Sequence, residues 1–153
     1  MKKLYSFMLL AVTAAWFASC STDIVYSRFA PMESKEWNAD SAVRFDFLIT
    51  DAAASYRMLV YVRHNERYPY QNMWLFINDG VRRDTIEFYL ADDRGKWLGD
   101  QHHGFIEMPV LYEQEKQFPD TGQYTLSIEH GMRDSLLRGI MDIGLEIRRN
   151  GEK

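Results

Sequence analysis

Apolar and polar residues alternate along several stretches of the chain, which is the pattern of β-strands that bury one face. The clearest stretch spans residues 42–50 and puts four large apolar side chains on one face: Val43, Phe45, Phe47 and Ile49. Alternation resumes over residues 56–63, where the second face also carries Leu59 and Tyr61. The pattern therefore predicts one strand with a single buried face and a second strand with both faces partly covered.

Further strand signals follow in the rest of the chain. Residues 72–78 form an apolar run that ends in the turn signal Asn-Asp-Gly, and the later alternating stretches are 85–90, 105–112, 124–129 and 143–148. Pro109 predicts an edge strand or a bulge, because proline cannot donate to a sheet ladder. The period changes at residues 131–138, where the spacing of Met132, Leu136 and Leu137 predicts one short helix.

These elements predict an all-β fold, an antiparallel β-sandwich of jelly-roll or immunoglobulin-like type with a short helix near residues 131–138. A closed barrel is the alternative architecture. The expected core comes from the apolar faces of the strands: Phe45, Phe47, Met58, Val60, Ile86, Phe88, Tyr124, Leu126, Leu145 and Ile147.

The N-terminus has the layout of an export signal, with two lysines before an uncharged apolar stretch over residues 4–17. That stretch is shorter than the roughly 20 apolar residues that a permanent transmembrane helix needs. Two small residues then precede Cys20, as in the lipobox of bacterial lipoproteins, although Phe17 stands where that motif prefers leucine. We therefore expect a lipoprotein signal peptide at 1–19, a lipidated N-terminus and lead-in at 20–38, and a single β-sandwich domain at 39–150.

Cys20 is the only cysteine in the chain and cannot form an internal disulfide. An incidental free thiol after an ordinary secretory signal is the alternative to acylation. One acyl chain, at about 0.8 kcal/mol per buried methylene, binds a membrane only marginally. The several acyl chains of a bacterial lipoprotein cysteine would make a stable anchor, so the membrane is the expected partner of this end.

The charge balance argues against nucleic acid as a partner. The chain carries 18 basic and 22 acidic residues, and removing residues 1–19 takes away two lysines and no acid, so the mature part has a net charge of −6. No basic cluster follows Cys20 that would add attraction to anionic lipid. The acyl chains alone are expected to hold the protein at the membrane.

Familiar motifs for nucleophilic catalysis, metal binding and phosphate binding are missing from the sequence. His102-His103 beside Asp100 has the wrong spacing for known zinc sites and is expected in a solvated loop. Asp92-Asp93 lacks the spaced ligands of a calcium loop and is expected in a turn. No converging acid–base pair stands out among the 22 carboxylates. The sequence thus predicts no enzyme activity, no metal and no cofactor.

Four aromatic residues could form either core or a binding surface: Tyr68, Tyr70, Trp74 and Trp97. A core position is the ordinary expectation for aromatics in strands. Pro69, however, favours an exposed extended turn around the two tyrosines, and Trp97 lies in a glycine-containing loop. We therefore expect Tyr68, Tyr70 and Trp97 to form one surface for a partner.

Three stretches carry a family resemblance: residues 68–77 (YPYQNMWLFI), residues 84–99, which begin with DTI and end with GKWLG, and residues 122–144, from GQY to GIMDIG. Together with the lipoprotein start, they resemble the GldH-type gliding-motility lipoproteins. The resemblance implies a component of the gliding machinery in bacteria that also use type IX secretion, and it implies no catalytic residues. Only the lipidated Cys20 transfers with a defined role.

Three tripeptides are also similar to the Asp-Ser/Thr-apolar acceptor of the O-glycosylation system in the same bacterial group, and their hydroxyl residues are Ser41, Thr85 and Ser135. Thr85 is equally explained as part of a strand, and Ser135 as part of a helical turn. Glycosylation therefore stays open, with a bulky surface group as its consequence.

Two functions from different classes remain. The first is a non-enzymatic lipoprotein of the cell envelope, an accessory or structural component of a gliding motility or type IX secretion-associated apparatus that contacts other envelope proteins. The alternative is a lipid-anchored glycan- or peptide-binding module at the cell surface, which rests on the tryptophans and on fold analogy.

Overall fold

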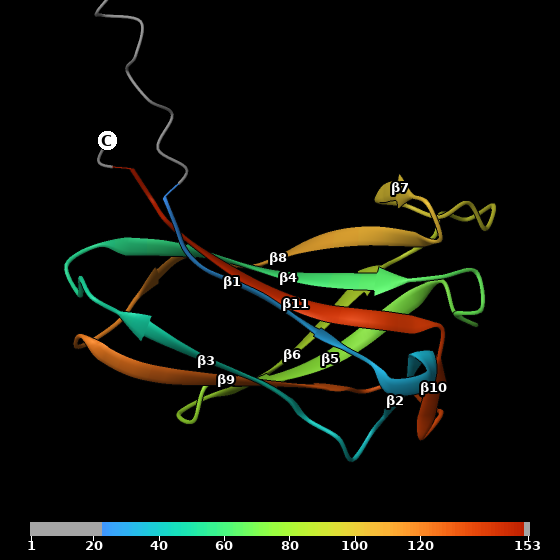
Figure 1. The fold of residues 1–153 in the computed structure, drawn as a ribbon, viewed down its shortest axis with the longest axis horizontal. Helices are drawn as coiled ribbons and strands as arrows, with labels where there is room; N and C mark the ends of the chain where they lie inside the picture. Colours follow the sequence, from blue (N-terminus) through green and yellow to red (C-terminus); the bar gives the residue numbers. More distant parts are fainter. Residues whose placement is uncertain (1–22, 152–153) are drawn as a thin grey trace, which may run out of the picture.

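Antiparallel strands make up nearly all the regular structure of the computed structural model, which describes residues 23–151. A five-stranded sheet has the order β1-β11-β4-β8-β7, and its strands are β1 (Ile24–Pro31), β11 (Ile140–Arg149), β4 (Ser55–His64), β8 (Phe105–Gln117) and β7 (Asp100–His102). A four-stranded sheet has the order β3-β9-β5-β6, and its strands are β3 (Val43–Ile49), β9 (Gly122–His130), β5 (Asn72–Asn78) and β6 (Arg83–Tyr89). The two sheets form two facing layers (Figure 1), which confirms the predicted sandwich.

The space between the sheets is filled by the apolar faces of the alternating strands. Seven of the ten expected core residues are buried: Phe45, Phe47, Met58, Val60, Leu126, Leu145 and Ile147. The other three, Ile86, Phe88 and Tyr124, are partly buried and pack against them. Each fully buried apolar side chain contributes about 1.5–3 kcal/mol relative to an exposed one. The core list read from the alternation is therefore confirmed.

A two-stranded ribbon lies at one end of the sandwich, where β2 (Glu36–Asn38) follows the 3-10 turn η2 (Glu33–Lys35) and pairs with β10 (Leu136–Arg138). Trp37 and Leu137 pair across this ribbon, and both side chains are buried in the core. The short helix expected near residues 131–138 is therefore wrong. Its three apolar residues do not share a face, because Leu136 is exposed whereas Met132 packs against the core.

Regular structure begins earlier than the lead-in at 20–38 suggested. Strand β1 pairs with β11 from Ile24 to Pro31, and β2 also lies within the lead-in. The pattern hid β1 because it is an edge strand whose first two apolar residues, Ile24 and Val25, are exposed. Tyr26 does reach the core, where its ring lies 5.7 Å from that of Phe47.

Pro109 lies in β8 at a point where that strand has a neighbour on one side only. It is opposite Tyr61 of β4, whereas β7 pairs only with residues 105–107 of β8. The edge position expected for this proline is confirmed, since its missing N–H removes no ladder bond on the free side.

The sandwich has two distinct ends along its long axis (Figure 1). One, which we call the N-terminal end, holds the start of β1 and the turns β3–β4, β5–β6 and β8–β9. Here the Arg149 N–H donates to the Asp23 carbonyl at 2.7 Å, and the Arg149 guanidinium pairs with Asp51 at 2.6 Å. The opposite end, which we call the far end, holds the β4–β5 and β6–β7 loops and the β2–β10 ribbon.

Candidate functional site

The turn between β5 and β6 is held in one shape by two short side chains. The Asn78 carboxamide oxygen accepts from Gly80 N–H at 2.8 Å, and one Asp79 carboxylate oxygen accepts from Val81 and Arg82 N–H at 3.0 and 2.7 Å. Gly80 adopts φ +87°, a conformation that glycine tolerates without strain. The Asn-Asp-Gly turn signal is thus confirmed, and it fixes where the charged groups beside it point.

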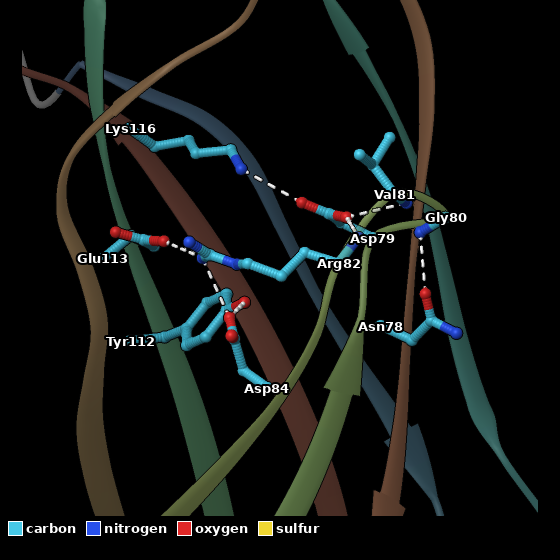
Figure 2. Close-up of polar contacts among 9 residues, drawn as sticks. All are labelled: Asn78, Asp79, Gly80, Val81, Arg82, Asp84, Tyr112, Glu113 and Lys116. Carbon is cyan, nitrogen blue, oxygen red and sulfur yellow. Dashed lines mark hydrogen bonds and ion pairs between the residues drawn. The ribbon is translucent and has the colours of Figure 1, made fainter.

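Charged side chains from this turn reach across to the other sheet. Lys116 Nζ of β8 lies 3.0 Å from Asp79 Oδ2, and the Arg82 guanidinium pairs with both Glu113 of β8 and Asp84 of β6. The Tyr112 hydroxyl donates to Asp84 Oδ2 at 2.6 Å (Figure 2). These contacts, which we call the bridging network, join the free edge of β8 to β6 and so cover two sheet edges with charge.

The network keeps its groups in fixed protonation states. Burial alone would raise the pKa of Asp79, but the N–H groups of Arg82 and Val81 and the Lys116 ammonium outweigh it and lower that pKa. Burial, reinforced by the hydrogen bond to Asp84, raises the pKa of the Tyr112 hydroxyl. The carboxylate therefore stays ionised and the phenol stays protonated near neutral pH.

An apolar pocket of about 330 Å³ lies beside the bridging network at the N-terminal end, where residues of the β5–β6 and β8–β9 turns line it. Its walls come from both sheets and from the β8–β9 turn: Phe47, Met58, Phe118, Tyr124 and Leu126. Its rim includes Asp79, Arg82, Tyr112 and Lys116 of the network. The arrangement suits an apolar group inside and offers polar contacts at the mouth.

The same groups are poorly placed for chemistry. The one carboxylate of the rim, Asp79, is paired with Lys116, and no histidine or cysteine among the described residues lines the pocket. Across residues 23–151, no three side chains of the His, Cys, Asp or Glu types come together as a metal site would require. His102 and His103 are exposed, and the His102 ring stacks on Phe105 at 4.8 Å.

The three aromatics expected to form a partner surface do come together, at the far end. Tyr68 is only 3 % exposed, whereas Tyr70 and Trp97 are partly exposed and pack against the core. The exposure expected of Tyr68 is therefore wrong, and a partner surface that includes Tyr70 and Trp97 stays a prediction. The Tyr68 ring lies 6.0 Å from that of Tyr70 and 6.4 Å from that of Trp97. Pro69 did not force exposure, because the Tyr68 hydroxyl finds the Asn72 carbonyl at 2.6 Å and can be buried with its polar tip satisfied.

Exposed aromatics lie instead on the outer face of the four-stranded sheet, a surface that the sequence did not single out. Trp74 and Tyr89 are 38 % and 58 % exposed. In the β5–β6 ladder Trp74 is opposite Glu87, and Asn72 is opposite Tyr89, so the two rings are diagonal neighbours on one face. Asn72 donates to Glu87 between them at 2.6 Å. The alternation within residues 72–78 could have revealed this exposure, because Trp74 lies on the opposite face of β5 from the buried Met73 and Leu75.

The remaining candidate residues fall on the surface or outside the described part. Ser41, Thr85 and Ser135 are all exposed, so their hydroxyls are accessible for modification. Cys20 lies outside residues 23–151. Within that described stretch, we find no helix with the length and apolar character needed to cross a bilayer.

Comparison with known proteins assigns the family. The protein is similar to the gliding motility lipoprotein GldH homolog of Christiangramia forsetii, with 29 % identity over 162 residues that cover 98 % of this chain and 99 % of the relative. It is similar to the gliding motility lipoprotein GldH of Flavobacterium johnsoniae, with 27 % identity over 91 % of this chain and 93 % of the relative. Among solved structures, dimeric latent PorU from Porphyromonas gingivalis aligns with a TM-score of 0.42 and 10 % identity, over 87 % of this chain and 14 % of that one.

The family model described as GldH lipoprotein matches residues 24–147, from the first strand to the last. The resemblance noted in the sequence is thereby confirmed, and the chain belongs to the GldH lipoprotein family.

Proposed function

We propose that this protein is a non-enzymatic accessory component of a gliding-motility apparatus, associated with type IX secretion and anchored in the cell envelope by lipid on Cys20. The family match over residues 24–147 carries this proposal, together with relatives named as gliding motility lipoproteins. The ion-paired carboxylates of the bridging network support a role without catalysis. Residues 1–19 would then serve as the export signal.

Contacts with other envelope proteins would use the outer face of the four-stranded sheet. Trp74 and Tyr89 are exposed there, and Arg83 of the same face lies over the Phe76 ring, with the guanidinium carbon 4.8 Å from the ring centre. Tryptophan, tyrosine and arginine are the residue types that most often dominate binding energy at protein interfaces. Thr85 is on this face as well, so a glycan attached to it would sit inside the proposed contact.

A gene deletion tests the proposed role. In a gliding host, deletion should abolish spreading on agar, and the wild-type gene should restore it. Cys20→Ala should restore it poorly although the domain still folds, because the anchor is lost. Normal spreading of the deletion strain, or full rescue by Cys20→Ala, would contradict the proposal.

The partner surface is tested with matched variants. Trp74→Ala and Tyr89→Ala should leave the melting temperature unchanged, and the envelope proteins that co-purify with the wild-type protein should be lost. Truncating an anchor residue is expected to weaken partner binding by about 2 kcal/mol or more. Leu111→Ala is the control, because Leu111 is 53 % exposed on the other sheet. If the variants instead lose binding to glycans on an array and keep their protein partners, the alternative function as a glycan-binding module holds.

A further inference from the structure

The pocket at the N-terminal end exists because two neighbouring strands have unequal lengths. β5 pairs with β9 only from Leu75 to Asn78, whereas β9 runs on to Gly122. The β5–β6 turn then bends toward β8, where Asp79 and Arg82 find their partners (Figure 2). The first residues of β9 therefore have β3 on one side and the pocket on the other.

The pocket is suited to an apolar chain without a charged head. At roughly 30 Å³ for a group the size of a water or a methylene, a volume of about 330 Å³ holds about ten such groups. One carboxylate, Asp79, and two cations, Arg82 and Lys116, line the mouth, and both cations are already ion-paired with carboxylates of the bridging network. A phosphate or a free carboxylate would have to displace one of these pairs, so an uncharged head is favoured.

Sheet geometry places the mouth near the start of the described chain. Arg149 N–H bonds to the Asp23 carbonyl, and Tyr56 is paired with Arg149 on one side and with Lys116 on the other. Asp23 and Lys116 are thus three strand spacings apart, or about 14 Å. Cys20 precedes Asp23 by three residues, which reach at most about 10 Å. An acyl chain that spans one leaflet adds about 15 Å.

From these observations we infer that the pocket holds one acyl chain of the lipid on Cys20. The inference rests on the lipid anchor in the proposed function and adds an internal site for part of that lipid. The thioether-linked glyceride of a lipoprotein cysteine has no phosphate, which matches a mouth without a free cation. While one chain is held by the domain, fewer chains remain in the bilayer, so the protein leaves the membrane more readily.

The test uses the full lipidated protein. Cells are grown with a fatty acid that carries a photoreactive diazirine, and the purified protein is irradiated and digested. The expected product is an intramolecular link between the Cys20 peptide and a peptide from residues 112–126 or 79–82, identified by mass spectrometry. Leu126→Phe, which fills the pocket, should lower its yield at least several-fold. If that variant does not fold, the linkage map of the wild-type protein decides alone.

Each outcome has a separate meaning. Links from the lipid of Cys20 only to other regions or to neighbouring lipids overturn the inference and leave the anchor intact. A pocket adduct with the mass of a whole phospholipid, seen equally in Cys20→Ala, assigns the pocket to bilayer lipid and also overturns it. If no label is attached to Cys20, the anchor in the proposed function fails and the inference fails with it.

Discussion

Aromatic side chains are packed differently at the two ends of the sandwich. At the far end, the rings of Tyr68 and Trp97 pack against the buried His64, at 5.7 and 4.7 Å, and the Tyr70 ring packs against Tyr68. At the N-terminal end, the rings of Phe47, Phe118 and Tyr124 also meet, but they leave a pocket of about 330 Å³ between the sheets.

Backbone geometry explains the difference. Gly139, at φ +82°, lets two backbone segments approach so closely that a Cβ atom there would lie 2.4 Å from the Tyr68 nitrogen. At the N-terminal end β5 stops at Asn78, and charged pairs rather than apolar side chains bridge the gap. The backbone is therefore packed closely around Tyr68 at the far end, whereas the N-terminal end keeps an apolar pocket between the sheets.

The largest expected effect comes from truncating one ring at each end. Tyr68→Ala should lower the free energy of unfolding by about 3–5 kcal/mol, because it opens a cavity in a closed cluster. Phe118→Ala enlarges a pocket that already exists, so about 2 kcal/mol is expected. Urea denaturation measures both, and equal losses would mean that the two ends are packed alike.

Glycine substitutions give the next largest difference. Gly139→Ala combines the cost of a positive φ with a clash against the Tyr68 backbone, and about 2–3 kcal/mol should be lost. Gly80→Ala is the matched control, because Gly80 also has a positive φ but nothing lies within 4 Å of its missing Cβ. It should cost about 1 kcal/mol. Thermal melts compare the pair, and a control as damaging as Gly139→Ala would argue against the close approach.

Acid should weaken the far end. Burial lowers the pKa of His64 and of His130 in the folded protein, so the unfolded chain binds more protons once the pH falls below the ordinary histidine value of about 6.5. Stability is then complete above that pH and falls below it, by at most about 1.4 kcal/mol per pH unit for each histidine. His64→Phe should reduce the slope measured by denaturation between pH 7 and 5. If His64→Phe leaves the dependence of stability on pH unchanged, His64 does not cause the loss of stability in acid.

The smallest effect is expected from the bridging network. Lys116→Met removes the partner of Asp79 in a pair that is about one-fifth exposed, and should cost less than about 1 kcal/mol. Added salt should lower the stability of the wild-type protein slightly and that of the variant by a smaller amount, because salt screens the ion pair that the variant lacks. If a melting experiment instead shows that Lys116→Met lowers the free energy of unfolding by several kcal/mol, the network is needed to hold the two sheets together.

The sequence predicted the sandwich and its core because alternation reports directly which side chains face inward. It missed β1, since an edge strand with exposed Ile24 and Val25 needs no alternation. It misjudged Tyr68 because proline signals a turn but does not say whether the turn is covered, and here Gly139 and the Asn72 carbonyl cover it. The bridging network joins residues 28 to 37 positions apart, and no local pattern encodes such pairs.

The central proposal is that the lipid on Cys20 anchors the protein, which requires the N-terminal end of the sandwich to face the membrane. This orientation can be tested with fluorophores on Ala53→Cys in the β3–β4 turn of that end and on Asp93→Cys in the β6–β7 loop of the far end, both exposed positions. In vesicles that contain headgroup spin-labelled lipid, the lipidated protein should show strong quenching at residue 53 and weak quenching at residue 93. Equal quenching at the two positions, or stronger quenching at residue 93, would contradict the account.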